Sequence, residues 1–285
     1  MNVTHTTFAE YRDHMGSDLT VVNAARASFG KESDWEYDEV KIKPDPQDPE
    51  ASVWCAPKRL KPDDANLIRF LATGYRTKEW DEFLNEVIEQ ARNGGKRGLT
   101  EMLHGYKRKP QHWAPFGHPH VQIRVSMPIF LARQFVKHQV GGVWSEESRR
   151  YVSDEPEVYI PEEPGVYIPE EWHTRPEDIK QGAGNVHENS EMWGQAACEQ
   201  TKNAVALYNQ AVGSGIAPEE ARTILPLNMM TTVVWTGSLL FWSRVVNQRV
   251  DGHAQLAAQV LGKQISAIVG PLFPVSWREL TGRTE

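Results

Sequence analysis

Cysteine is nearly absent from this 285-residue chain, which contains only Cys55 and Cys198. Two cysteines cannot build a disulfide framework or a zinc site made of cysteines alone, and such scarcity is typical of proteins from a reducing compartment. No run approaches the roughly 18 consecutive apolar residues that a membrane-spanning helix needs. The stretch MNVTHTTFAEYRDHM at the start also lacks the apolar core of a secretion signal. We therefore expect a cytosolic protein with no membrane partner.

Several catalytic motifs are missing as well. The sequence contains no G-x-S-x-G, no Walker A motif, no G-x-G-x-x-G fingerprint and no H-E-x-x-H. His118 and His120 could share a strand face, but no third ligand stands at a useful spacing, so we expect no metal site. Cys198 lies beside alanines in a predicted helix, which favours a core position over a nucleophilic one. Ser148 has charged neighbours but no evident general base, so we assign it hydrogen bonding only.

The formal net charge is -7, from 38 acidic and 31 basic side chains, and it argues against a nucleic-acid polymer as partner. Residues 152–171 account for the whole excess, because they hold seven acidic residues and no lysine or arginine. The unit VYIPEE occurs there twice, at Val158–Glu163 and Val166–Glu171, among four prolines. We interpret residues 152–180 as an acidic, proline-rich insertion that forms a solvated surface flap or a contact between subunits.

Apolar spacing predicts a chain that is mostly helical. Helices are expected over 77–93 and 190–212, over 251–269 with Asp251 as the cap of a last helix, and over a short segment from Pro218. A further short helix is expected over residues 18–29, ending at Gly30. Alternating polar and apolar residues predict a strand over His120–Ser126, followed from Pro128 by the helix PIFLARQFVKHQ. These elements indicate an α+β fold.

A cluster of polar and cationic side chains follows that strand. On a helix, Arg133 and Lys137 share one face, and Gln134 and His138 share the adjacent one. Two cations beside an amide and an imidazole suit a phosphate group that carries a polar heterocycle. An ordinary solvated helix face is the alternative interpretation.

Carboxylates, hydroxyls and two arginines come next, in the stretch SEESRRY at 145–151. This composition could bind the polar edges and the phosphate of a nucleotide. It could equally form internal helix pairs such as Glu146 with Arg150, each worth a few tenths of a kcal/mol.

Three arginines stand in otherwise apolar segments near the C-terminus: Arg222, Arg244 and Arg249. Arginine is poorly tolerated in apolar surroundings unless an anion meets it. Pairing with protein carboxylates, or extension of the charged end to the surface, is the alternative.

The stretch Lys137–Tyr151, KHQVGGVWSEESRRY, resembles the signature of the flavin-dependent thymidylate synthases, in which Arg-His-Arg precedes a serine and an Arg-Tyr pair. DLTVVNAARASFGK at 18–31, HWAPFGHP at 112–119 and the segment 221–255 resemble further blocks of that family in the same order. The resemblance covers most of the chain except about 32–60 and 152–190. The KHQ form of the signature resembles that of bacteriophage members.

This resemblance implies a single α+β domain over 1–285, with a central, mainly antiparallel sheet packed by several long helices. The implied activity is the methylation of dUMP to dTMP, with methylenetetrahydrofolate as carbon donor, FAD as cofactor and NADPH as reductant. It also implies a methyltransferase that is a homotetramer with shared active sites and that needs no cysteine nucleophile. A flavin-dependent dUMP hydroxymethylase and a non-catalytic flavin- or nucleotide-binding relative are the alternatives.

The family's functional positions fall on residues of this chain. The positions implied for dUMP are Gln134, Lys137, Glu146, Glu147, Ser148, Arg150, Arg222 and Arg249. Those implied for FAD are Ser28, Lys137, His138, Gln139, Glu146, Ser238 and Arg244. Arg249 is the catalytic candidate, because a guanidinium against the pyrimidine edge stabilises negative charge that develops on N3 and the carbonyl oxygens.

Two departures from the signature bear on phosphate binding. Lys137 and Gln139 replace its two arginines, and eight residues, not seven, separate Gln139 from Ser148. Lysine keeps a point charge but lacks the planar fork that binds phosphate in a bidentate manner. Arg244 is expected to replace part of the lost positive charge near the FAD pyrophosphate.

Overall fold

The computed structural model describes residues 3–37, 58–93, 99, 112–148, 165–176 and 182–283. The chain divides into two compact units, each assembled from two separate stretches. The first, which we name the sheet unit, comprises Met1–His14 and His120–Val269, and the second, the helical unit, comprises Met15–Pro119 and Gly270–Glu285. Arg150, Cys55 and the first VYIPEE copy lie outside the described residues. The expectation of a single domain over 1–285 stays a prediction.

A four-stranded sheet in the order β2-β5-β8-β6 forms the centre of the sheet unit. Its strands are β2 (Phe8–Met15), β5 (His120–Pro128), β6 (Gly142–Glu146) and β8 (Met230–Ser238). Strand β8 runs antiparallel to both β5 and β6, with His120 opposite Ser238 and Pro128 opposite Met230. The predicted α+β fold with an antiparallel sheet is therefore confirmed, and the predicted strand continues to Pro128.

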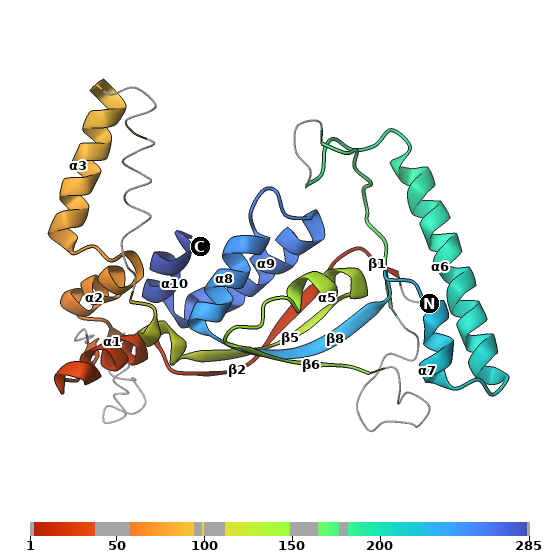
Figure 1. Cartoon of the computed structure of the whole chain (residues 1–285), viewed down its shortest axis with the longest axis horizontal. Helices are drawn as coiled ribbons and strands as arrows, with labels where there is room; N and C mark the ends of the chain where they lie inside the picture. The colour runs from red at the N-terminus through yellow and green to blue at the C-terminus, as the bar shows by residue number, and fades with distance from the viewer. Residues whose placement is uncertain are drawn as a thin grey trace, which may run out of the picture. The chain divides into compact units, whose positions relative to one another are not determined.

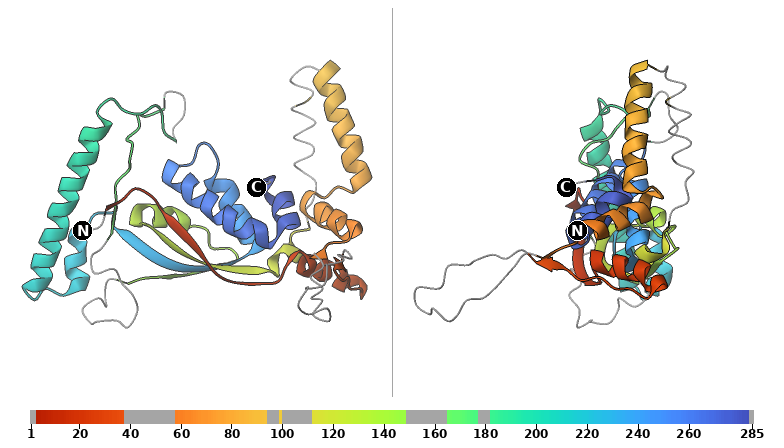
Figure 2. Two further views of the ribbon diagram at one scale, coloured as in Figure 1. Left: turned by 180° about the vertical axis from the view of Figure 1, so that it is seen from behind. Right: turned by 90° about the vertical axis from the view of Figure 1, so that its left-hand side faces the viewer.

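Three helices cover one face of this sheet, as two opposite views show (Figures 1 and 2). They are α5 (Ile129–Phe135), α8 (Leu239–Arg249) and α9 (Leu256–Val269). Alternate residues of β5, such as Val121 and Ile123, are fully buried, as expected for a strand with one covered face. The indole of Trp235 on β8 lies edge-on to Trp144 and Trp242, with ring centroids 4.9 Å apart in both pairs. Aromatic packing of this kind makes the core rigid beneath α8.

Two glycines face each other across β6 and β8 and make room for the ring of Phe241. Gly142 is the register partner of Gly237, and a Cβ on Gly237 would lie 2.1 Å from Phe241 Cδ1. Phe241 is in the first turn of α8, whose N-cap is Ser238. The close approach of α8 to the sheet therefore depends on the missing side chains.

Replacing Gly237 with alanine is expected to lower the free energy of unfolding by about 1–3 kcal/mol, because the buried Phe241 ring must shift. Urea unfolding monitored by tryptophan fluorescence measures this change. Gly213→Ala is the matched control, since nothing lies within 4 Å of a Cβ at that position. Equal urea midpoints for the two variants would contradict the packing interpretation.

The end of the acidic segment is buried, which corrects the surface-flap interpretation for that part. Strand β7 (Val166–Tyr167) pairs in parallel with β1 (Val3–Thr4), and the Ile168 amide donates to the Thr4 carbonyl. The second VYIPEE copy thus places Val166, Tyr167 and Ile168 in the interior, at 0%, 8% and 4% exposure. Its glutamates, Glu170 and Glu171, are exposed. Composition correctly predicted that these charged residues are exposed, but it did not indicate that the apolar triplet is buried.

The long helix α6 (Ser190–Gly213) confirms the helix predicted over 190–212. One side of it packs against α7 (Pro218–Ala221) and the 3-10 turn η3 (Arg222–Ile224) through Tyr208 and Ala211. The short helix expected from Pro218 is confirmed over Pro218–Ala221 and continues as the 3-10 turn to Ile224. Leu225 is extended, as a residue before proline prefers to be, and this conformation ends the helical stretch.

The helical unit packs its first helices against the end of the chain. It contains α1 (Asp18–Arg26), η1 (Ala27–Phe29), β3 (Glu36–Tyr37), β4 (Lys58–Arg59), α2 (Pro62–Thr73), α3 (Thr77–Asn93), η2 (Ala114–Gly117), η4 (Gly270–Leu272) and α10 (Pro274–Thr281). The helices expected over 18–29 and 77–93 are confirmed, and Gly30, where the first of them ends, has a left-handed conformation. The buried Asp18 carboxylate accepts from the amides of Val275 and Ser276 at 2.9 Å, so it caps α10.

Two helix boundaries differ from the prediction. The helix after Pro128 ends at Phe135, so Lys137 and His138 lie in the turn beyond it and do not share helical faces with Arg133 and Gln134. The helix assigned to Asp251 begins only at Leu256, and α10 follows it. Asp251 instead accepts from the His253 amide at 2.9 Å, which closes a local turn.

Candidate functional site

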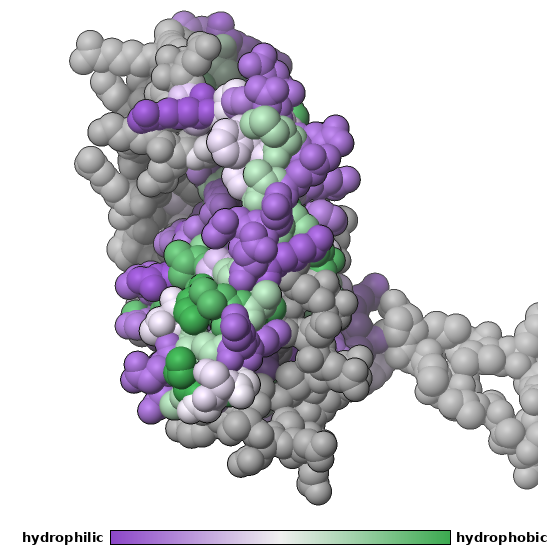
Figure 3. Space-filling model, turned by 90° about the vertical axis from the view of Figure 1, so that its right-hand side faces the viewer, coloured by the Kyte–Doolittle hydropathy of each residue, from purple (hydrophilic) through white to green (hydrophobic). Residues whose placement is uncertain are grey.

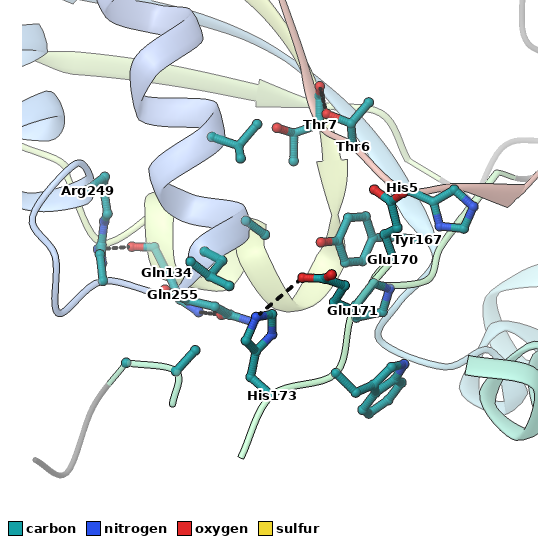
Figure 4. A pocket seen from close by; sticks show the side chains of 18 of the residues that line it. His5, Thr6, Thr7, Gln134, Tyr167, Glu170, Glu171, His173, Arg249 and Gln255 are labelled. Carbon is teal, nitrogen blue, oxygen red and sulfur yellow. Dashed lines mark hydrogen bonds and ion pairs between the residues drawn. The ribbon is translucent and has the colours of Figure 1, made fainter. Parts of the chain in front are cut away.

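A cavity of about 1030 Å³ lies in the sheet unit where α5 and α8 end (Figure 4). Gln134 reaches it from the last turn of α5, and Arg249 is the last residue of α8. Residues 5–7, 167, 169–174 and 253–257 complete much of the wall. Two of the residues predicted for dUMP, Gln134 and Arg249, are thus brought together although they are far apart in sequence.

The Arg249 guanidinium is held by contacts with the end of α5. Its Nε donates to His138 Nε2 at 3.0 Å, and its Nη2 donates to the Gln134 carbonyl at 2.7 Å. Its Cζ lies 5.4 Å from the centroid of the Phe135 ring, within the range of a cation–π contact. Burial lowers the pKa of the guanidinium from its ordinary value. Arginine nevertheless remains charged at neutral pH, so the cavity has a fixed cation in its wall.

The neighbouring imidazole of His138 is neutral. Burial, followed by the positive charge of Arg249, lowers the pKa of His138 from 6.5 to about 4. Because Arg249 Nε can only donate, His138 Nε2 is the acceptor, and the ring proton of the neutral imidazole resides on Nδ1. An uncharged acceptor beside the guanidinium holds it without electrostatic repulsion.

NMR titration of the imidazole is expected to give a pKa of about 4 for His138. A histidine whose pKa is lower in the folded than in the unfolded chain takes up its proton first in the unfolded chain. Its contribution to stability is therefore complete above pH 6.5 and declines as the pH falls toward 4. Arg249→Gln removes the second cause, so the pKa should rise in that variant. A wild-type value near 6.5 would contradict the buried, neutral state.

A second cavity, of about 610 Å³, collects another part of the predicted site. Glu146, Glu147 and Ser148 line it from the end of β6, and Arg222 lines it from η3. Glu146 lies in a strand, so the alternative of a helix pair with Arg150 is wrong for this residue. The four predicted side chains offer carboxylates, a hydroxyl and a guanidinium, which suit a polar, anionic ligand.

The Glu146 carboxylate is fixed on both oxygens. Thr231 Oγ1 donates to one oxygen at 2.9 Å, and Trp144 Nε1 donates to the other at 3.2 Å. The exposed guanidinium of Arg222 uses its Nε on the Glu219 carbonyl at 3.2 Å. Arg222 also lines the cavity and is the cationic member of this cluster.

The predicted dUMP residues thus form two groups in one chain. Gln134 and Arg249 line the first cavity, and the Glu146–Ser148 group with Arg222 lines the second, with no lining residue in common. Lys137 is exposed in the turn after α5, and Arg150 lies outside the described residues.

The residues predicted for FAD have different environments. Lys137, Gln139 and Arg244 are exposed, whereas Ser238 is buried and its Oγ accepts from the Phe241 amide as the cap of α8. Arg244 lies in an otherwise apolar helix but is exposed at the surface, as arginines in such helices often are. Ser28 belongs to the helical unit, where its hydroxyl donates to the Ala25 carbonyl at 3.1 Å.

Several wall residues of the first cavity were not predicted: His5, Tyr167, Trp172, His173 and Gln255. Gln255 accepts from Gln134 Nε2 at 2.7 Å, and His173 Nε2 lies 3.8 Å from the Glu171 carboxylate (Figure 4). Most of them come from the segment that we interpreted as a flap. The signal that could have revealed them is the apolar VYI triplet within an otherwise acidic stretch.

Within the described ranges, no group of three or more His, Cys, Asp or Glu side chains could hold a metal ion. None of the helices in these ranges combines the length and the hydrophobicity that a membrane span requires.

Comparisons of the sequence with known proteins agree on one family. The family described as "Thymidylate synthase complementing protein" matches residues 12–275. Flavin-dependent thymidylate synthase from Kosmotoga olearia is 30% identical over 213 residues, covering 69% of this chain and 84% of that protein. The Streptomyces coelicolor enzyme of the same name is 28% identical over 210 residues, covering 67% and 84%. A crystal structure of the UMP/dUMP methylase PolB from Streptomyces cacaoi, bound with 5-Br dUMP, shares the fold with a TM-score of 0.65 at 20% identity, covering 99% of this chain and 97% of PolB.

Proposed function

Because this chain belongs to the thymidylate synthase complementing protein family, whose matched relatives are flavin-dependent thymidylate synthases, we propose that it methylates dUMP to dTMP. In this proposal methylenetetrahydrofolate is the carbon donor and NADPH the reductant of FAD. The observation that carries the proposal is the Arg249 guanidinium, held by α5 and directed into a large cavity beside Gln134. The family match and the fixed cation in the cavity wall both support the proposal.

Arg249 would act on the pyrimidine by electrostatics. Carbon–carbon bond formation at C5 requires an electron-rich ring, with negative charge on N3 and the carbonyl oxygens. A guanidinium that is already positioned stabilises this charge at no cost in reorganisation. The proposed route uses no cysteine nucleophile, and Cys198 lines neither of these two cavities.

FAD would supply the hydride chemistry, and the chain would supply binding and charge. The exposed cations Lys137 and Arg244 suit its pyrophosphate, and Gln139 offers an amide to a ring or a ribose. Ser238 fits less directly, because its hydroxyl already accepts a helix amide and is buried. The donor set therefore fits an anionic dinucleotide, with positive charge drawn from the turn after α5 and from α8.

We further propose a homotetramer whose active sites are shared between subunits. The separation of the dUMP residues into two cavities supports this, because a second chain could bring its Glu146–Arg222 group to the Arg249 group of the first. Helix α6 offers an apolar contact surface, since Met192, Trp193 and Leu207 are 52%, 48% and 52% exposed. Figure 3, seen from the side of α6, shows apolar side chains gathered among hydrophilic ones.

The test is release of tritium from 5-labelled dUMP in the presence of FAD, NADPH and methylenetetrahydrofolate, with mass spectrometry of the product. We expect tritium release and a product with the mass of dTMP. A product heavier by one oxygen would identify a hydroxymethylase. A purified protein that binds no FAD and releases no tritium would contradict the proposed function.

A further inference from the structure

The donors of Arg249 divide into two sets. A guanidinium has five N–H groups, and here the Nε hydrogen and one Nη2 hydrogen are used on His138 and on the Gln134 carbonyl. Among the described residues, Nη1 donates to no protein group, and Arg249 lines the cavity. The Nη1 hydrogens and the second Nη2 hydrogen therefore remain for a ligand. Two N–H groups on neighbouring nitrogens suit a planar edge with two acceptors.

The main chain around Arg249 is also closely packed, in this case against α9. A Cβ on Gly262 of α9 would lie 2.7 Å from Val250 Cγ2 and 3.4 Å from Arg249 Cβ. The absence of a side chain at Gly262 thus allows α9 to pack directly against the end of α8. On the other side, Phe135 packs against the guanidinium. The remaining freedom of Arg249 is rotation about its outer bonds, which the two hydrogen bonds restrict.

His138 is placed behind the guanidinium and not in the cavity wall. It bonds to Arg249 but is absent from the cavity lining, whereas Gln134 and Arg249 both contribute to that lining. The second hold on Arg249 is a backbone carbonyl, which no side-chain replacement can remove. His138 is therefore the side chain whose removal would leave Arg249 Nε without its acceptor.

We propose that His138 is a positioning residue for the reaction, which holds Arg249 so that its Nη1 and free Nη2 hydrogens face the pyrimidine edge. The proposal rests on the proposed function and adds a role for His138 beyond the flavin contact that the family resemblance implies. A neutral imidazole suits this role better than a carboxylate. A carboxylate would neutralise the guanidinium and weaken its attraction for developing negative charge.

The test compares two replacements in the full-length holoenzyme. His138→Leu removes the acceptor, whereas His138→Gln retains a neutral acceptor at about the reach of Nε2. We expect His138→Leu to lower kcat per bound flavin by about 10- to 100-fold, with little change in the Kd for dUMP, because misplacement of a catalytic group acts mainly on the transition state. His138→Gln should keep most of the wild-type kcat. His14→Leu, at an exposed histidine of β2, is the matched control.

A second readout does not depend on turnover. The Nε–H resonance of Arg249 in 15N NMR should be protected from exchange in wild type and in His138→Gln, and should lose protection in His138→Leu. Equal protection in all three proteins would overturn the inference, even if tritium release confirms the proposed function. Loss of flavin from His138→Leu with unchanged kcat per bound flavin would overturn it as well, because His138 would then serve the cofactor alone. Loss of protection in His138→Leu would support the positioning role even if wild type releases no tritium.

Discussion

Replacing Arg249 with alanine is expected to lower the rate of tritium release from 5-labelled dUMP by about 100- to 1000-fold. The physical reason is the loss of a fixed cation from a half-buried position, where its interaction with negative charge is stronger than in water. Because the guanidinium also contacts His138 and the Gln134 carbonyl, Arg249→Lys should restore only a small part of the rate. Lysine supplies the charge without the planar set of donors.

Flavin content and thermal stability of Arg249→Ala should be measured beside the rate, because they separate a catalytic loss from a folding defect. Arg12→Ala is a suitable control, since Arg12 is exposed and, among the described residues, pairs with Glu10 at 3.2 Å. We expect wild-type rates for this control. Unchanged tritium release in Arg249→Ala would remove Arg249 from the mechanism, while leaving the family membership intact.

The second large effect concerns two inactive variants that restore activity when they are mixed. Arg249→Ala disables the first cavity and Arg222→Glu disables the second, by placing a carboxylate where an anionic ligand is expected. If each active site combines the first cavity of one chain with the second cavity of another, some sites in a mixed oligomer contain both intact parts. With random mixing of equal amounts, about a quarter of the sites should be intact, giving about a quarter of the wild-type rate.

This experiment requires subunit exchange, for example by co-expression of the two variants with different affinity tags. A double variant carrying both replacements, mixed with itself, is the matched control and should stay inactive. If mixing Arg249→Ala with Arg222→Glu restores nothing although mixed oligomers are isolated, both cavities belong to the same chain's site. Shared active sites would then be wrong.

The sequence predicted the principal elements because their patterns are local. The alternation in His120–Ser126 and the helical spacing in 190–212 both correspond to observed elements. Helix ends were predicted less well, since the helix of Arg133 ends at Phe135. The chain turns there so that the His138 amide can donate to the Phe135 carbonyl at 3.0 Å and the ring can meet Arg249. The contact with Arg249 involves a partner more than a hundred residues away, which no local pattern contains.

For the acidic segment, the prediction from composition was wrong about burial. Its charge and its prolines predicted a solvated insertion, yet Val166 is fully buried and pairs with Val3. Burial of three apolar residues outweighs the tendency of the flanking glutamates to stay in water, because those glutamates can remain exposed at the edge. Tyr167 then contributes to the wall of the first cavity. The composition of the whole twenty-residue segment could not distinguish the buried apolar residues from the exposed glutamates.

By itself, the sequence determined the family, through motif blocks in a characteristic order, and it predicted which side chains bind an anion and a pyrimidine. It also determined the alternation and the spacing that make the sheet and its helices. Only the tertiary structure decided that Arg249 meets His138 and Gln134, and that the Glu146 group lines a different cavity with Arg222. The physical reason is the distance along the chain over which each effect acts. Propensity and periodicity act over a few neighbouring residues, whereas these contacts exist only once α8 has packed on the sheet over Gly237 and α9 has packed against Arg249 at Gly262.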